Sequence, residues 1–371
     1  MKRNKIIIIL SFIAFNYLSC GHIDEANEGI WNVYIPLKNE NKTDLALISE
    51  LSNHMDTIYL SSNDNCIVGR IEDVLIDNDV LFIVSNNSIL KFSIDGIYLD
   101  KIERRGRGHG EYISINRIDL LPSKKEIYIF DRNSKKILVY SYDGNFIRNI
   151  DLEDYPQDFA ILPNGDLLYF TPQTYKGIPR RGLWKTDSLG CNEELLIPID
   201  DSYKKVSIID RYLVHIDSCT VGLMGIEDTD LFYNISSDTI KTTCRFSTDI
   251  SMSKHKTRNN EIIEEPLSGY IKAGYFESNR LLIFEATDAV STNVRVVVDK
   301  QNKKQYNLYS SDLKRIQSID EAFPFFNYCY NGNFFTVLYA NEILSNEKFH
   351  QDFFPTITSE SNPVITILHS K

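Results

Sequence analysis

The sequence predicts an all-β protein, and more specifically a six-bladed β-propeller whose N- and C-terminal strands close the ring. Two observations support this fold class. Tyr and Phe number 21 and 20 among 371 residues, and aromatic side chains are enriched in strands. A short apolar strand after a turn also recurs along the chain, at intervals close to the repeat of a propeller blade, about 40–50 residues.

The clearest internal repeat relates residues 81–102 to residues 127–150. Each segment has an apolar strand, a polar turn, a second strand ending in an aromatic residue, a D-G turn and a third strand. Asp95-Gly96 and Asp143-Gly144 lie 48 residues apart, and D-G between apolar runs predicts a hairpin because glycine tolerates positive φ.

Weaker copies begin at residues 167, 212, 281 and 334. With the starts at 81 and 127 they give six units, spaced 46, 40, 45, 69 and 53 residues. The long fourth interval contains the charged stretch SMSKHKTRNNEIIEEP at 251–266, which we expect to be an insertion on one face. A β-sandwich with an appended domain, the alternative fold, does not predict six units.

Residues 1–19 are expected to form a signal peptide. Lys2, Arg3 and Lys5 give it a basic head, and residues 6–15 form an apolar run of 10 residues, about half the length that crosses a bilayer. A buried core helix or strand is the alternative. The order of basic head, short apolar run and small residue before a cysteine favours export.

Leu18-Ser19-Cys20 resembles the lipobox of bacterial lipoproteins, although Tyr17 stands where an aliphatic residue is usual. The resemblance implies that Cys20 is lipidated and that residues 20–29 form a short tether. The alternative is ordinary signal-peptidase cleavage with a free cysteine. Each buried CH₂ of an acyl chain contributes about 0.8 kcal/mol, so a lipid on Cys20 would anchor the protein without a transmembrane helix.

Three acidic residues, Asp24, Glu25 and Glu28, follow Cys20. They resemble the acidic tract that routes lipoproteins of Bacteroidetes-type bacteria to the cell surface. We therefore expect an exported lipoprotein of the outer membrane, located on its periplasmic side or at the cell surface.

Residues 30–371 are expected to form a single propeller domain. The last blade of a propeller is commonly completed by a strand from the other terminus, which leaves no open seam in the ring. The segments IWNVYIPL at 30–37 and PVITILHS at 363–370 are the strands predicted to join.

The segment between residues 102 and 144 contains RRGRGHGEY followed by IYIFDRNSKKILVYSYDG. It resembles the six-bladed β-propeller lipoproteins of gut Bacteroidetes, which have NHL-like repeats and usually read G-x-G-P-G-E-Y at the first motif. His109 stands where that motif has proline. Asp131 matches the position at which an acidic side chain caps a turn in NHL-like repeats. The resemblance covers nearly all of the mature chain and implies the same fold and a cell-envelope location.

Charge limits the partners of the protein. Forty basic and 51 acidic residues give a net charge of −11, and removal of residues 1–19, which hold three basic and no acidic groups, leaves 37 minus 51, or −14. No segment concentrates enough Lys and Arg to offset this charge, so a nucleic-acid partner is not expected. The membrane should be contacted through the lipid anchor only. We expect a monomer.

Sequence motifs of the common enzyme classes are missing. The chain has no G-x-S-x-G elbow, no H-E-x-x-H, no Walker A motif and no EF-hand loop. The five cysteines beyond Cys20 include no C-x-x-C spacing, which speaks against a metal knuckle or redox motif, and buried free thiols are expected. No catalytic residue is assigned and no cofactor is predicted.

The best candidate for a ligand site is the arginine- and glycine-rich segment that joins two repeats. Its candidate residues are Arg104, Arg105, Arg107, His109, Glu111 and Tyr112. Connections of this kind in propellers lie near the central channel, and arginine binds carboxylate or sulfate in a bidentate fork. Glu111 and Tyr112 would complete a polar pocket. The alternative is structural: the glycines allow a tight crossover, and Glu111 satisfies backbone N–H groups.

These features favour a lipid-anchored, non-enzymatic binding or scaffold module for a glycan, a peptide or a partner protein of the cell envelope. The alternative is a metal-dependent hydrolase or lactonase, resembling six-bladed enzymes that hold Ca²⁺ in the central channel. Such ligands come from different blades, so sequence spacing neither reveals nor excludes them. A third hypothesis is a structural role in envelope assembly. Carboxylate or amide oxygens that converge at the channel mouth would favour the enzyme.

Overall fold

The computed structural model describes most of the chain after residue 29. The described residues are 30–35, 55–62, 66–171, 180–199, 211–224, 231–248, 256–258, 261–263, 270–288, 293–309 and 326–369. The predicted signal peptide, Cys20 and the tether lie outside them. Within these ranges no helix is long and apolar enough to cross a membrane.

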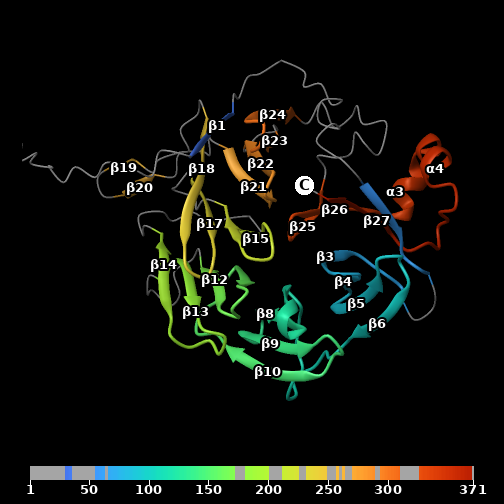
Figure 1. Ribbon diagram of the computed structural model, residues 1–371, viewed down its shortest axis with the longest axis horizontal. Helices are drawn as coiled ribbons and strands as arrows, with labels where there is room; N and C mark the ends of the chain where they lie inside the picture. Colours follow the sequence, from blue (N-terminus) through green and yellow to red (C-terminus); the bar gives the residue numbers. More distant parts are fainter. Residues whose placement is uncertain are drawn as a thin grey trace, which may run out of the picture.

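Six β-sheets surround a central axis, which confirms the predicted six-bladed propeller (Figure 1). Each blade is a sheet of four consecutive antiparallel strands, except for the features described below. Blade 1 contains β3 (Ile71–Asp77), β4 (Val80–Ser85), β5 (Ser88–Ser93) and β6 (Tyr98–Ile102). Blade 2 contains β7 (Arg117–Leu121), β8 (Glu126–Asp131), β9 (Lys136–Ser141) and β10 (Phe146–Asp151). Blade 3 contains β11 (Asp158–Ile161), β12 (Leu167–Thr171), β13 (Gly182–Thr186) and β14 (Glu194–Pro198).

The second half of the ring uses two strands from the N-terminal part of the chain. Blade 4 contains β15 (Leu213–His215), β16 (Val221–Leu223), β17 (Leu231–Ile235), β18 (Ile240–Thr248) and, as a fifth strand, β1 (Trp31–Ile35). Blade 5 contains β21 (Tyr270–Glu277), β22 (Leu281–Asp288), β23 (Asn293–Asp299) and β24 (Lys304–Tyr309). Blade 6 contains β25 (Tyr328–Tyr330), β26 (Asn333–Leu338), β27 (Val364–His369) and β2 (Met55–Tyr59).

The first strand of each blade lines the central axis. These strands contact one another in a closed circle, from β3 through β7, β11, β15, β21 and β25 back to β3. The fourth strands lie at the outer rim (Figure 1). Side chains on the first strands therefore decide what the channel can hold.

Five small elements of the described part of the chain lie outside the blade sheets. A short 3-10 turn, η2 (Pro122–Lys124), follows β7, and two short helices, α3 (Ala340–Ser345) and α4 (Glu347–Phe353), connect β26 to β27. The strands β19 (Lys256–Arg258) and β20 (Glu261–Ile263) form a two-stranded sheet of their own. This hairpin lies in the charged stretch 251–266, which is an insertion, as predicted.

The two D-G turns have the same geometry. Gly96 and Gly144 both have φ of +80°, and each donates its N–H to the serine carbonyl three residues earlier at 2.9 Å. A side chain at Gly96 would meet the Tyr59 carbonyl oxygen at 2.1 Å, so this turn of blade 1 needs glycine both for its φ and for its contact with the end of blade 6. The repeat deduced from residues 81–102 and 127–150 is thus one structural unit.

The six predicted strand starts do not all mark the same strand. Those at residues 81, 127, 167, 281 and 334 fall in second strands, whereas residue 212 leads into β15, a first strand. The second strand of blade 4, β16, has only three residues, with glycine in the middle. Its apolar signal is therefore weaker than that of the buried segment Tyr212–Ile216.

The predicted pairing of residues 30–37 with 363–370 is wrong. The strand that joins β27 is β2, which pairs antiparallel with it, Met55 opposite Leu368 and Tyr59 opposite Val364. The earlier strand, β1, instead runs parallel to β18, with Trp31 opposite Cys244. The ring is still closed by strands from the two ends of the chain, but the N-terminal contribution comes from residues 55–59.

Chain connectivity explains this difference. In blades 1 to 3 the fourth strand leads to the first strand of the next blade with no described strand between them, as β6 leads to β7 through residues 103–116. Residues 60–70 make the equivalent connection from β2 to β3. A strand at 31–35 lies too far along the chain from β3 to serve as that fourth strand, so it is left to cover the edge of blade 4.

None of the five cysteines in the described residues forms a disulfide. Cys66, Cys244 and Cys329 are buried, as predicted for free thiols, whereas Cys191 and Cys219 are exposed. Burial raises the pKa of Cys329 to about 12, and the thiolate is the reactive form. We expect iodoacetamide to label Cys191 and Cys219 rapidly in the folded protein at pH 8, and the buried thiols only after denaturation. Peptide mass spectrometry measures this, and equally fast labelling of Cys329 and Cys219 would contradict the buried position of Cys329.

Candidate functional site

The channel carries a repeated aspartate. Asp73, Asp119 and Asp158 lie in the first strands of blades 1, 2 and 3, and all are at least 96% buried. In each case Oδ1 accepts the N–H of the following residue, at 3.0, 2.8 and 2.9 Å. The same local bond in three consecutive blades shows that these residues occupy equivalent positions.

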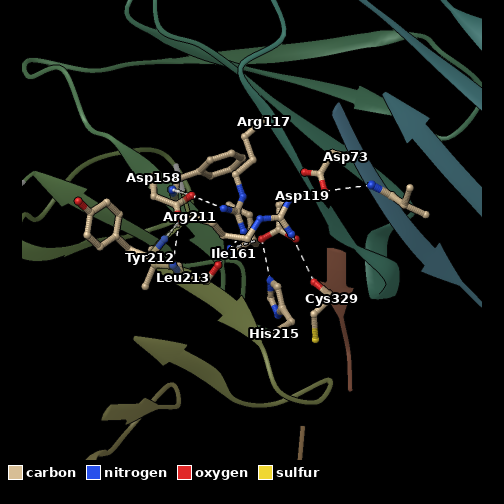
Figure 2. Close-up of polar contacts among 12 residues, drawn as sticks. Asp73, Arg117, Asp119, Asp158, Ile161, Arg211, Tyr212, Leu213, His215 and Cys329 are labelled. Atoms are coloured by element: carbon tan, nitrogen blue, oxygen red, sulfur yellow. Dashed lines mark hydrogen bonds and ion pairs between the residues drawn. The ribbon is translucent and has the colours of Figure 1, made fainter. Parts of the chain in front are cut away.

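Each of these aspartates faces a cationic or imidazole side chain from another blade (Figure 2). Arg117 Nη1 lies 2.7 Å from Asp158 Oδ1, which joins blades 2 and 3. Arg211, two residues before β15, donates to Asp73 and so spans the ring from blade 4 to blade 1.

The third aspartate, Asp119, faces a histidine: His215 Nε2 lies 2.8 Å from Asp119 Oδ2.

Backbone groups of neighbouring blades join the same network. Asp119 Oδ2 accepts the N–H of Ile161 at 2.6 Å, and Asp158 Oδ2 accepts the N–H groups of Tyr212 and Leu213 at 2.7 and 2.8 Å. Arg117 Nη2 donates to the Leu213 carbonyl at 2.7 Å. One carboxylate therefore serves both an ion pair and the first strand of the next blade.

Blades 5 and 6 are linked through Cys329. Its carbonyl accepts a long hydrogen bond of 3.5 Å from Arg211 Nη1, and its thiol donates to the Glu277 carbonyl at 3.3 Å. The ring of Tyr330 packs 5.0 Å from His215. All six blades are thus connected by contacts that begin at the channel.

Burial dominates the electrostatics of these groups. It raises the pKa of Asp158, against the opposing effects of Arg117 and of the two backbone N–H groups. It lowers the pKa of Arg117, and Asp158 opposes that change. A buried charge is tolerated only with a partner of opposite charge, so removal of either residue would leave the other uncompensated.

The described channel residues do not fit a Ca²⁺ site. Calcium needs six to eight oxygen ligands that converge on one point, whereas Asp73, Asp119 and Asp158 each point at an arginine or histidine. Among the described residues, no three His, Cys, Asp or Glu side chains are grouped so that they could hold a metal ion. This geometry gives no support to the alternative of a hydrolase or lactonase with a metal in the channel.

The sequence carries a signal for these aspartates that the motif patterns above do not include. Asp73, Asp119 and Asp158 each begin a run of apolar residues, and they are spaced 46 and 39 residues apart, close to the spacing of the repeats. Arg117 and Arg211 carry no such signal, because their partners come from other blades.

The arginine- and glycine-rich segment lies away from the channel. It connects β6 to β7, but it packs against the outer strands of blade 2: the His109 ring is 4.9 Å from Phe146 of β10, and Tyr140 of β9 donates to the Gly110 carbonyl at 2.5 Å. The prediction that this connection lies near the central channel is therefore wrong. The segment lies at the outer rim, at the junction of blades 1 and 2.

Backbone and side-chain bonds brace the segment. Tyr112 N–H donates to the Arg104 carbonyl at 3.0 Å, and Gly106 N–H donates to the Tyr112 carbonyl at 2.9 Å. Glu111 Oε2 accepts the Gly108 N–H at 2.8 Å, and a side chain on Gly106 would meet that oxygen at 1.9 Å. This geometry agrees with the structural alternative given above, in which the glycines allow a tight crossover and Glu111 accepts a backbone N–H.

The six candidate residues divide into two groups. Tyr112 is fully buried, and its hydroxyl lies 3.1 Å from the Asn87 carbonyl, so its polar end is engaged inside the protein. Glu111 caps the loop. The side chains of Arg104, Arg105 and Arg107 are exposed, and none of them forms an ion pair with a described acidic residue. Exposed His109 flanks them on Phe146.

Comparison with known proteins agrees with the fold. A Bacteroides fragilis protein whose description proposes that it is exported has a TM-score of 0.71 at 15% identity, over 92% of this chain and 99% of that one. A member of the DUF4221 family from Bacteroides vulgatus has a TM-score of 0.50 at 10% identity, over 85% of this chain and 96% of that one. At these identities the likeness shows the fold alone.

No curated protein sequence matches the chain. A family model described as a domain of unknown function, DUF4934, matches residues 32–369. That match covers both N-terminal strands and all six blades, and the chain therefore belongs to the DUF4934 family.

Proposed function

We propose that this protein is a lipid-anchored, non-enzymatic binding module of the bacterial cell envelope, and that it binds an acidic partner at the junction of blades 1 and 2. The observation that carries the proposal is the braced segment that presents three exposed arginines in an otherwise acidic chain. Both a glycan and a peptide can carry the carboxylate or sulfate groups that this segment would recognise.

The contacts of the segment support a binding role. Arginine recognises carboxylate and sulfate through paired N–H donors, and a rigid loop loses less conformational entropy when it binds. Arg104, Arg105 and Arg107 sit on a loop whose backbone is already fixed by Tyr112 and Glu111. Their guanidinium groups have no described acidic partner within the protein that a ligand would have to displace.

The position of β1 supports anchoring with this surface outward. Lipidation of Cys20 and location at the outer membrane are part of the proposal. The predicted tether ends directly before β1, which lies at the edge of blade 4. Blade 4 lies across the ring from blade 1 (Figure 1), so an anchor at that edge would hold the arginine segment away from the membrane.

The proposal includes the NHL-like character of the repeats. Asp131, at the end of β8, accepts the N–H groups of Asn133 and Ser134 at 3.1 and 3.3 Å. This is the turn-capping role that the resemblance implied for an acidic residue after the second strand.

Replacing Arg104, Arg105 and Arg107 by Ala is the direct test. We expect the triple variant to bind heparin or polygalacturonate beads at least tenfold more weakly than the unmodified protein, which corresponds to about 1.4 kcal/mol. Charge-assisted hydrogen bonds of about 1.5–3 kcal/mol each make this a conservative estimate. Retention of the protein on the beads at low and high salt measures the effect.

A second triple variant controls for net charge. Lys124, Lys304 and Lys348 are exposed and lie on blades 2, 5 and 6. Their replacement by Ala removes the same charge without touching the segment, so binding should be retained. Equal loss of binding in both variants, or none in either, would refute a site at the arginine segment.

A further inference from the structure

A pocket of about 470 Å³ lies at the junction of blades 2 and 3. Its walls come from the connection between β10 and β11, from β12, and from the turn between β13 and β14. The residues that matter for its chemistry are Asp151, Glu153, Asp154, Tyr169, Cys191 and Glu193. At the preceding junction, the arginine-rich segment covers Phe146 and Tyr140, whereas here the connection of residues 152–157 is shorter.

A fixed guanidinium organises the polar wall. Arg180 contacts three carboxylates: Nε lies 2.8 Å from Asp154 Oδ2, Nη1 lies 3.2 Å from Glu153 Oε2, and Nη2 bonds to Glu193. The guanidinium lies 4.6 Å from the centre of the Trp184 ring, which stacks parallel to Tyr169. Tyr169 also donates its hydroxyl to Glu193.

One buried carboxylate in this wall is incompletely satisfied. Asp154 is only 4% exposed, and its Oδ2, although 2.8 Å from Arg180 Nε, has no hydrogen-bond partner of good geometry among the described residues. Burial raises its pKa, and the neighbouring Arg180 opposes that change. A buried acceptor without a donor is unfavourable, so this oxygen calls for an N–H or O–H group from whatever enters the pocket.

Charge and shape together select the kind of donor. Arg180 already neutralises part of the wall, and Lys136 Nζ lies 3.5 Å from Asp151, so attraction for a further cation is reduced. Carboxylate oxygens nevertheless outnumber the N–H groups that face them, while Leu152 and Leu167 add an apolar wall. A small, partly apolar ring that carries hydroxyl groups suits both walls, because the hydroxyls donate to the carboxylates and the ring contacts the leucines. Pockets of about 300–1,000 Å³ accept small-molecule ligands.

We propose that this pocket binds a mono- or disaccharide through hydroxyl groups that donate to Asp154 and Glu153. The pocket lies at the junction of blades 2 and 3, whereas the arginine segment lies at the junction of blades 1 and 2, so the two sites are independent. Binding of an acidic partner at that segment and sugar binding here can therefore succeed or fail separately.

Cys191 provides a readout within the pocket. It lines the pocket and is exposed, and Cys219, which is also exposed, does not line it. N-ethylmaleimide labelling is followed by mass spectrometry in the presence of glucose, galactose, N-acetylglucosamine, maltose or lactose, each at increasing concentration. At least one sugar should slow the labelling of Cys191 at least fivefold in a saturable way and leave that of Cys219 unchanged.

Two substitutions locate the effect. For Asp154→Ala, the sugar concentration that gives half-maximal protection of Cys191 should rise at least tenfold. Glu126→Gln is the matched control, because Glu126 also bonds to an arginine and a tyrosine, Arg148 and Tyr128, but lines no part of this pocket. Circular dichroism melts establish that both variants are folded. Should Asp154→Ala not fold, Asp154→Asn replaces it with the same expectation.

Three results would overturn the proposal. The first is that none of the five sugars protects Cys191. The second is that protection is unchanged in the folded Asp154 variant. The third is that ethylammonium protects Cys191 at lower concentration than any of the sugars, which would identify a cation site.

Discussion

Removal of residues 363–371 is expected to abolish the cooperative unfolding transition of the protein. The deletion takes away β27, which lies between β26 and β2 and carries the closure of the ring. Four of its side chains, those of Val364, Ile365, Ile367 and Leu368, are at most 1% exposed. Burial of each contributes about 1.5–3 kcal/mol, or about 6–12 kcal/mol together. The net stability of a protein is of the same size, about 5–15 kcal/mol.

Thermal melts followed by circular dichroism, together with limited proteolysis, measure this effect. A control that lacks only residues 370–371 keeps the whole of β27 and should melt like the full chain. Ile365→Ala is a graded version, expected to lower the free energy of unfolding by about 2–5 kcal/mol. If the deletion melted at the same temperature as the full chain, closure of the ring by β27 and β2 would be incorrect.

Substitution of Asp158 by Ala is expected to lower the free energy of unfolding by about 3–5 kcal/mol, the usual cost of removing one partner of a buried ion pair. The change leaves the Arg117 guanidinium, whose side chain is only 11% exposed, without its ion-pair partner. It also removes the acceptor of the Tyr212 and Leu213 N–H groups. Blade 3 thereby loses contacts to blades 2 and 4 at once.

Urea denaturation of single and double variants separates these contributions. Arg117→Met combined with Asp158→Asn removes both charges and retains a side-chain acceptor, so we expect the double variant to recover part of the loss. Lys101 and Glu103 form an exposed ion pair with side chains 46% and 50% exposed, and Lys101→Ala should cost at most about 1 kcal/mol. Equal costs for Lys101→Ala and Asp158→Ala would show that the channel network has no special role in stability.

The repeat unit could be predicted because its causes are local. A D-G turn needs a positive φ that glycine adopts readily, and Gly96 and Gly144 have the same φ. The apolar runs at 81 and 127 were therefore correctly predicted to be strands, and the structure shows that they are the second strands of their blades. Blade 4 shows the limit of this reasoning, since its short second strand is less apolar than its first.

The candidate site could be predicted only in part. The glycines of the arginine-rich segment indicated a tight crossover, and Glu111 does cap the Gly108 N–H. The position of the segment at the rim was not predicted, because it depends on Phe146 and Tyr140, which come later in the chain. The fully buried state of Tyr112 depends on Asn87 in the preceding blade.

The sequence by itself determined the number of blades and the turns between their strands, because these depend on short-range patterns. Only the tertiary structure decided which strands close the ring and which charges meet in the channel. Asp73 and Arg211 are 138 residues apart, and they meet only because the ring brings blades 1 and 4 to opposite sides of one axis. The aspartates recur at the spacing of the repeats, but their partners Arg117, Arg211 and His215 do not, so the sequence does not show which side chains pair.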